Sequence, residues 1–204
     1  MAEERTPAAA AVGDPTRGDP VRRDPAPLVV AVVPEAALSP ADRAEIRAFL
    51  VAAYAPRFAD VFSAHDFWGG PAEGRVLVRT AGGRLAAHCG YGLRTIAVGD
   101  REVRIAGVGA VATDPGLRGR GAGRAMFDAL AGHLAGQAAF LFLECADPVV
   151  GFYERCGFAH ARATVTAIEP ATGAPDTSVS NVLTRPLAGG AWPEGEIDLR
   201  GLRW

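Results

Sequence analysis

The chain has no lysine, and all 21 of its basic residues are arginine. A nucleotide-binding P-loop requires a Gly-Lys-Ser/Thr triplet, so this class of phosphate site is excluded. Cysteine is scarce as well: Cys89, Cys145 and Cys156 are odd in number and form no CxxC pair. We therefore expect free thiols in a reducing compartment rather than a disulfide framework or a cysteine nucleophile.

Long apolar runs and an excess of charge are also missing. No stretch is long enough to span a bilayer. The net charge of -2 gives no reason to expect nucleic acid or an anionic membrane as a partner. We expect a cytoplasmic protein that binds a small molecule and no metal, and the sequence leaves open whether it forms a homodimer.

Apolar residues make up 49% of the chain, enough for a full core. Residues 1–27 lack periodicity and are predicted to be a disordered tail, followed by a single domain over residues 28–204. The predicted elements are a strand at 28–33, a helix capped by Ser39, a loop or broken helix at 55–70, strands at 75–80, 84–98 and 102–112, a helix after residue 123, a strand at 138–145, a short helix at 147–156, strands at 159–169 and 178–187, and a tail at 188–204. This order predicts an α/β (α+β) fold with a mixed, mostly antiparallel sheet and helices on both faces. A bulge is predicted near Gly90 and Gly92.

A glycine-rich loop joins the strand at 102–112 to the next helix. The loop consists of Arg118, Gly119, Arg120, Gly121, Ala122, Gly123 and Arg124, and Met126, Leu130 and Leu134 then recur with helical spacing. Free backbone N–H groups and the positive end of the helix dipole gather at such a place. The segment therefore predicts an anion site suited to a diphosphate.

The spacing of the glycines distinguishes between phosphate loops. A dinucleotide loop, G-x-G-x-x-G, is excluded because its third glycine falls on Arg124 or on Met126. The pattern R/Q-x-x-G-x-G/A is met by Arg118, Gly121 and Gly123, and it resembles the coenzyme A pyrophosphate loop of the GNAT N-acetyltransferases. A flexible strand–helix turn is the structural alternative. The predicted order of elements is also that of the GNAT fold.

The resemblance implies a site for acetyl-CoA as co-substrate. Residues 118–124 would hold the pyrophosphate, and Val111, Ala112 and Thr113 would offer backbone groups to the pantetheine arm. Residues 152–158 resemble the F-Y-x-x-x-G-F segment of the family, in which the tyrosine, here Tyr153, lies near the coenzyme A sulfur. A tyrosine there can assist departure of the thiolate.

The base that deprotonates the amine is less well defined. Glu144, at the end of its predicted strand, is our candidate catalytic carboxylate. Asp147 and His88 are alternatives, each with a structural interpretation: Asp147 as a helix N-cap and His88 as a core histidine.

The sequence resembles two GNAT subfamilies in residues beyond the motifs that the whole family shares. Residues 84–113 and 192–198 are similar to the nodulation N-acyltransferase NodA. The Ala-His at Ala87-His88, the Arg-Gly-x-Gly loop, Asp147, Tyr153 and the final Trp204 resemble the aminoglycoside 2'-N-acetyltransferases. In that second family a glutamate on the strand before the loop is the base, whereas Gly109 stands at this position here.

The resemblance implies an acceptor site as well. In the aminoglycoside family the carboxylate of the terminal tryptophan reaches the amino groups of the drug, so we expect Trp204 to contact the acceptor. Asp147 and Asp176 would add an acidic lining that attracts ammonium groups, and Trp68 and His88 complete the predicted set. We expect an N-acetyltransferase that acts on an amino sugar or an aminoglycoside-type antibiotic. A NodA-like N-acyltransferase with a longer acyl donor and a catalytically silent CoA-binding regulator are the alternatives.

Overall fold

We analysed a computed structural model that describes residues 27–55, 59–64, 67 and 70–204. The predicted N-terminal tail therefore lies outside the described residues except for its last one, Pro27. Trp68, predicted to contact the acceptor, lies outside them too.

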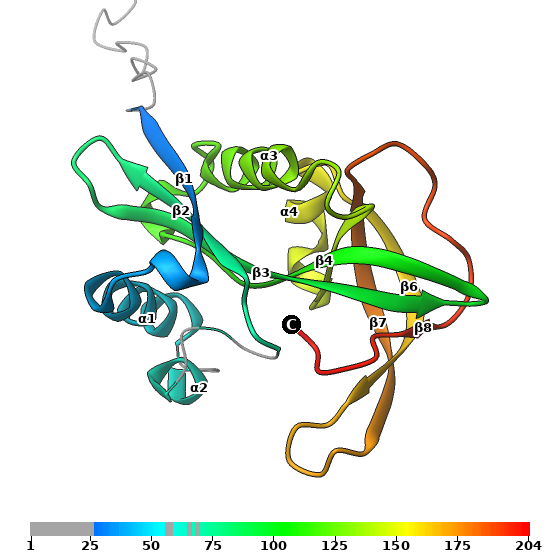
Figure 1. Cartoon of the computed structure of the whole chain (residues 1–204). Coiled ribbons are helices and arrows are strands. Elements are labelled where there is room, and N and C mark those ends of the chain that lie inside the picture. The colour runs from blue at the N-terminus through cyan, green and yellow to red at the C-terminus, as the bar shows by residue number, and fades with distance from the viewer. Residues whose placement is uncertain (1–26, 56–58, 65–66, 68–69) are drawn as a thin grey trace, which may run out of the picture.

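The described residues form one eight-stranded sheet (Figure 1). The predicted mixed sheet with helices on both faces is confirmed, with one strand more than predicted. The strands are β1 (Leu28–Pro34), β2 (Gly74–Thr80), β3 (Leu85–Val98), β4 (Arg101–Thr113), β5 (Phe140–Cys145), β6 (Ala159–Ile168), β7 (Pro175–Pro186) and β8 (Ile197–Asp198), in the order β1-β2-β3-β4-β5-β7-β6-β8. The helices are α1 (Pro40–Tyr54), α2 (Ala59–Ala64), α3 (Ala122–Leu134) and α4 (Val150–Arg155), with short 3₁₀ turns at Glu35–Ala37, Pro115–Leu117 and Asp147–Val149. No helix in the described part of the chain is both long and apolar enough to cross a membrane.

Helices cover the two faces of the sheet with separate cores. Ser39 starts α1 through a reciprocal capping box, in which its hydroxyl accepts a hydrogen bond from the Asp42 N–H and the Asp42 carboxylate accepts one from the Ser39 N–H. Ile46 and Leu50 of α1 are buried in a cluster on one face. On the other face α3 packs on β1–β4 through apolar side chains such as Phe127 and Leu130, and α4 packs beside it against β6 and β7. The sheet thus brings the end of β4 and the starts of α3 and α4 to one place.

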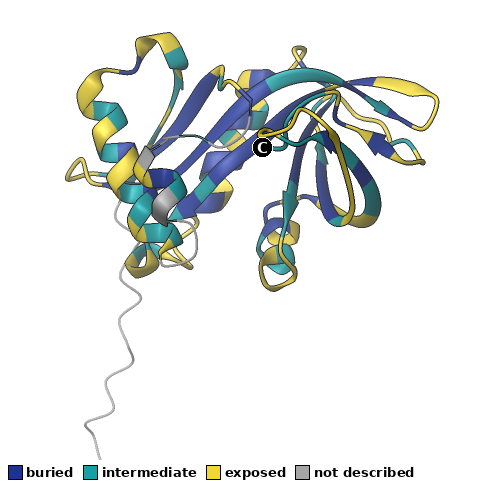
Figure 2. Ribbon diagram, turned by 90° about the horizontal axis from the view of Figure 1, so that it is seen from below, coloured by how far each residue is buried: buried dark blue, intermediate teal, exposed yellow. Residues whose placement is uncertain are grey.

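Part of the sheet closes on itself, which the sequence did not predict. β8 pairs in parallel with β6 and antiparallel with β3, so β3, β4, β5, β7, β6 and β8 form a hydrogen-bonded circuit that we call the ring. Its interior is filled by apolar side chains (Ile96, Val98, Val103, Ile105, Phe140, Phe142, Val165, Val182, Ile197 and Leu199). Figure 2 shows buried stretches along these strands, and β6 and β7 are each exposed over their first residues, 159–162 and 175–179. The prediction that residues 188–204 form only a tail is therefore wrong, because β8 closes the ring.

The start of β7 and the position of the bulge also differ from prediction. β7 begins at Pro175 rather than at residue 178, and it pairs with the whole length of β6 through residues 175–184. The bulge predicted near Gly90 does occur at that register, but the extra residue lies on the partner strand. His88 pairs with Ala112 and Gly90 with Gly109, so β4 carries one more residue than β3.

Candidate functional site

The bulge in β4 shapes the centre of the molecule. Ala110 adopts a left-handed conformation with φ of 51°, which is uncommon for a residue other than glycine. The ring nitrogen Nδ1 of the fully buried His88 lies 2.8 Å from the Ala110 carbonyl oxygen. His88, predicted to contact the acceptor, instead lies in the core and supports this bulge.

β4 and β5 part just before the bulge. Their parallel pairing covers only Ile105–Gly107 against Phe140–Phe142, although both strands continue further. The end of β4 is therefore free to turn toward the loop that precedes α3. We call the place beyond Gly107 and Phe142, where the two strands are no longer paired, the β4–β5 split.

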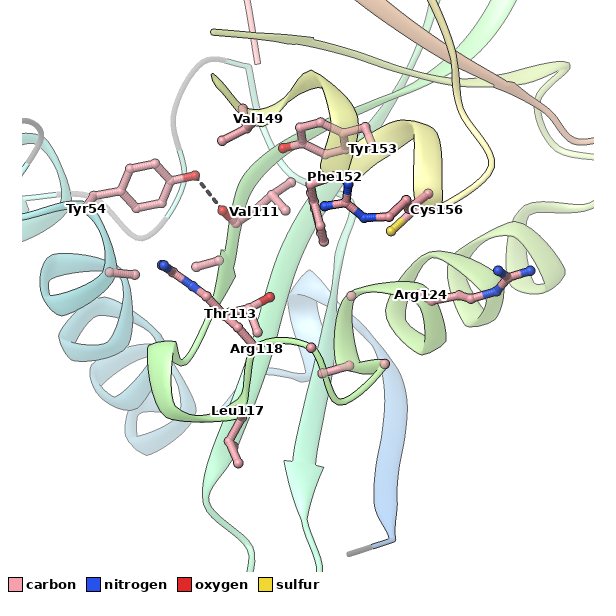
Figure 3. Close-up of a pocket in the computed structure, with 17 residues that line it drawn as sticks. Tyr54, Val111, Thr113, Leu117, Arg118, Arg124, Val149, Phe152, Tyr153 and Cys156 are labelled. Atoms are coloured by element: carbon pink, nitrogen blue, oxygen red, sulfur yellow. Dashed lines mark hydrogen bonds between the residues drawn. The ribbon is translucent and has the colours of Figure 1, made fainter. Parts of the chain in front are cut away.

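A cavity of about 640 Å³ lies beside the end of β4 (Figure 3). All of the predicted cofactor residues except Arg120 line it, and so does Tyr153. The lining also includes residues that the sequence analysis did not assign to a site (Ala53, Tyr54, Leu117, Val149, Phe152, Arg155 and Cys156). One cavity thus joins the strand, the loop and the helix that carries Tyr153.

The loop has the geometry of an anion site. Gly119 and Gly121 have φ of 74° and 82°, a conformation that side chains disfavour. Gly121 caps α3 without a side-chain hydrogen bond, so the first N–H groups of the helix are left for a ligand. A Cβ on Gly123 would lie 2.7 Å from the Phe152 ring, which explains why this position needs glycine.

Two tyrosines face the cavity. Tyr153 is buried, and burial is the main cause that raises its pKa well above 10, with weaker contributions from Tyr54 and nearby thiols. Tyr54, the last residue of α1, donates a hydrogen bond of 2.7 Å to the Val111 carbonyl oxygen (Figure 3). Burial raises the pKa of Tyr54 to about 12. The helical spacing of Tyr54 indicated a core residue, and no sequence signal distinguished it from one.

The predicted carboxylates do not line the cavity. The Glu144 carboxylate is only 14% exposed and pairs with the Arg203 guanidinium, which also lies 3.4 Å from an Asp176 oxygen. Asp147 instead accepts a hydrogen bond of 2.6 Å from the Asn181 amide. The structure thus brings Glu144 and Asp176 together through Arg203 and leaves Asp147 in a different contact.

Glycines on β3 and β4 make room for two aromatic rings on the face that lines the ring interior. The cross-strand pairs Gly92–Gly107 and Gly90–Gly109 form a bare floor that we call the glycine patch. A Cβ on Gly107 would lie 2.1 Å from the Trp204 indole, and a Cβ on Gly90 would lie 2.5 Å from the Phe67 ring. A Cβ on Gly109 would lie 3.1 Å from the main-chain carbonyl carbon of Trp204. Trp204 therefore lies at the β4–β5 split, beside the position where the aminoglycoside family carries its glutamate.

We find no candidate metal site in the part of the chain that the structure describes. No group of three or more His, Cys, Asp or Glu side chains there is arranged to hold a metal ion.

Comparisons with known proteins agree with this geometry. The family model described as an acetyltransferase (GNAT) domain matches residues 37–161, whereas no curated protein matches the chain. The GNAT family N-acetyltransferase YhbS from Escherichia coli, solved in complex with CoA, is 17% identical with a TM-score of 0.54, covering 85% of this chain and 90% of that one. A putative N-acetyltransferase from Lactobacillus plantarum is 18% identical with a TM-score of 0.52, covering 78% and 98%.

A third solved structure is a GNAT family acetyltransferase from Brucella melitensis in complex with acetyl-CoA. It is 20% identical with a TM-score of 0.50, covering 83% of this chain and 94% of that one. These likenesses show a common fold, and the family model spans more than half of the chain. The chain therefore belongs to the GNAT family and is an acyl-CoA-dependent N-acetyltransferase.

Proposed function

We propose that the protein transfers an acetyl group from acetyl-CoA to a primary amine on an amino sugar or an aminoglycoside-type antibiotic. The observation that carries the proposal is the placement of two sets of residues on either side of the β4–β5 split. Tyr153 and the glycine loop line the cavity on the side of α3 and α4. Trp204 and Glu144 lie on the side of the ring interior.

The donor half of the site fits acetyl-CoA. The loop offers unpaired helix N–H groups to a pyrophosphate, and Arg118 and Arg124 at the cavity wall add positive charge. Val111, Ala112 and Thr113 line the same cavity and offer backbone groups to an amide-bearing arm. The solved relatives from Escherichia coli and Brucella melitensis carry CoA and acetyl-CoA, which supports this assignment.

Acyl transfer requires the amine nitrogen to lose a proton, bond to the thioester carbon and displace the thiolate. A buried tyrosine that stays protonated can donate a hydrogen bond to the departing sulfur, and we assign this role to Tyr153. Holding both substrates at reacting distance supplies much of the remaining rate. We keep Glu144 as the candidate base, although it must act while Arg203 holds it.

The residues on the acceptor side of the β4–β5 split favour an amino sugar as the acceptor. Glu144 and Asp176 place two carboxylates near the β4–β5 split, and carboxylates attract ammonium groups. The resemblance to the aminoglycoside 2'-N-acetyltransferases and to NodA adds support, because both groups acylate an amino group on a sugar. Because Gly109 replaces the glutamate of the aminoglycoside family, only its tryptophan contact to the acceptor carries over, here to Trp204, and its base does not.

Thiol release from acetyl-CoA by the purified protein tests this proposal. The acceptors are aminoglycosides, kasugamycin, glucosamine, a simple alkyl amine and a peptide with a free α-amine, and a long-chain acyl-CoA is offered in parallel. We expect release with at least one amino sugar, and Trp204→Ala should raise its KM while the KM for acetyl-CoA stays unchanged.

The other results separate the alternatives. Release with the peptide alone would overturn the acceptor class and leave the acetyltransferase activity intact. A clear preference for the long-chain donor would favour the NodA-like reaction. Binding of acetyl-CoA without thiol release for any amine would indicate the regulator.

A further inference from the structure

We propose that Arg94 is a positioning residue that holds Trp204 and the segment before it as the wall of the acceptor site. The inference rests on the proposed function, since it takes the side of the β4–β5 split that carries Trp204 to be the acceptor side. It assigns a role to an arginine on β3 that neither the motifs nor the loop geometry point to.

Arg94 contacts residues 199–204 in three ways. Its guanidinium carbon lies 4.0 Å from the centre of the Trp204 ring. One guanidinium nitrogen donates hydrogen bonds to the Leu202 carbonyl at 2.7 Å and to the Leu199 carbonyl at 3.2 Å. A planar guanidinium can stack and donate at once, whereas a lysine ammonium cannot.

The glycine patch provides the opposite surface for the same indole. Gly92 and Gly107 are direct cross-strand partners, and a Cβ on either would lie 3.2 Å or less from the Trp204 side chain. Trp204 is thus confined by the bare backbone of two strands and by the Arg94 guanidinium. Gly201 also lies against Arg94, since a Cβ there would be 2.9 Å from the guanidinium.

The charge of Arg94 is not explained by an ion pair. Within the described ranges, its hydrogen bonds go to main-chain carbonyls of residues 199–202 and not to a carboxylate. A half-buried guanidinium that loses hydration is costly unless its contacts compensate. Here the hydrogen bonds and the ring contact lie on the segment that carries Trp204, and Gly70 lies against the same guanidinium. The arginine therefore ties that segment to β3.

Other anchors hold the same segment on its far side. Arg203 reaches Glu144, the Ser178 hydroxyl at 3.0 Å and the Val165 carbonyl at 3.2 Å. The Ile168 N–H donates to the Gly201 carbonyl at 2.9 Å. Loss of Arg94 should therefore release the indole without detaching the segment from β6 and β7, which separates positioning from unfolding.

The experiment measures two quantities on Arg94→Ala, Arg94→Lys and the matched control Arg104→Ala, which removes an exposed arginine of β4. The first is acrylamide quenching of the Trp204 indole, obtained by difference from Trp204→Phe. The second is the pair of KM values for acceptor and acetyl-CoA. We expect Arg94→Ala to expose the indole and to raise the acceptor KM about tenfold or more, with the acetyl-CoA KM unchanged. Arg94→Lys should fall between Arg94→Ala and wild type, and Arg104→Ala should match wild type.

Gly107→Ala gives the same test from the other side of the indole and leaves Arg94 in place. Its Cβ must expel the ring, so it should reproduce both effects, whereas Gly132→Ala, whose Cβ meets no atom within 4 Å, should not. Wild-type acceptor KM in both Arg94→Ala and Gly107→Ala would overturn the inference, as would an equal rise in both KM values. If amino sugars are not acetylated, the same comparison is made with whichever amine is, so the proposed function can fail while this inference stands.

Discussion

At the scale of single residues, burial decides what Tyr153 can do. A hydroxyl that is desolvated in the cavity stays protonated, because ionisation would place a charge in apolar surroundings. Tyr153 is therefore a persistent hydrogen-bond donor and a weak acid, as its proposed role beside the coenzyme A sulfur requires. Tyr54 provides the second hydroxyl of the cavity, but that hydroxyl donates to the Val111 carbonyl.

Replacing Tyr153 with phenylalanine should lower kcat by roughly 10²-fold, the low end of what a positioned proton donor contributes. The ring packs against Phe127 and Phe158, and phenylalanine keeps that packing. Steady-state kinetics and a direct acetyl-CoA titration test this, the titration serving as the control that should stay at its wild-type value. Wild-type turnover in the variant would return Tyr153 to a packing role.

The pH dependence of turnover should reflect the acceptor and not the tyrosine. The raised pKa of Tyr153 keeps its hydroxyl protonated up to and beyond about pH 10, so the hydroxyl remains a donor across the range in which the amine loses its proton. The rate should rise with pH and then level off. A falling limb below pH 10 that disappears in Tyr153→Phe would contradict the assignment.

At the scale of elements, the loop and the start of α3 act as one unit. Gly119 and Gly121 supply left-handed conformations, and Gly123 lets the first turn approach the Phe152 ring. These three glycines carry no charge. The backbone conformation that they allow nevertheless leaves free N–H groups at the positive end of the helix dipole, where an anion binds.

Gly121→Asp should abolish acetyl-CoA binding, because it adds strain at a φ of 82° and a negative charge beside the phosphates. The expected observation is loss of the rise in Tm that a bound ligand causes by mass action. Gly132→Asp is the matched control, since it places the same carboxylate on an exposed part of the same helix. An undiminished Tm rise in Gly121→Asp would show that the loop does not hold the pyrophosphate.

At the scale of the whole molecule, closure of the ring by β8 holds the segment that leads to Trp204 against the sheet. Ile197 is 1% exposed and packs in the ring interior, although its strand has only two residues. Ile197→Ala should lower the free energy of unfolding by about 2–5 kcal/mol, the range for large-to-small changes in a core. Denaturant unfolding measures this, with Val179→Ala at a side chain that is 60% exposed as the control. Equal, small losses in both variants would mean that β8 is not part of the cooperative core.

The sequence predicted those parts of the molecule in which local pattern and spacing carry the information. The Ser39 cap, the order of the first seven strands and the glycine-rich start of α3 belong to this group, and the fold class was confirmed. β8 was missed because two residues show no period, and its pairing partners lie far away in the chain. The Glu144–Arg203 pair and the Trp204–Arg94 contact were missed for the same reason, since each joins residues that only the closed ring brings together.

Closure of the ring also sets a constraint on how the chain folds. Val98 on β3 can pair with Ile197 of β8 only after Ile197 has been synthesised, 99 residues later (197 minus 98). Pairings so distant in the chain slow folding, because the intervening segment must be ordered before the contact forms. During synthesis the interior faces of β3 and β4 are therefore exposed to solvent and to other nascent chains until the last strand emerges. A ribosome that stalls before β8 would leave an apolar, unpaired sheet edge, the kind of surface that chaperones bind and that otherwise aggregates.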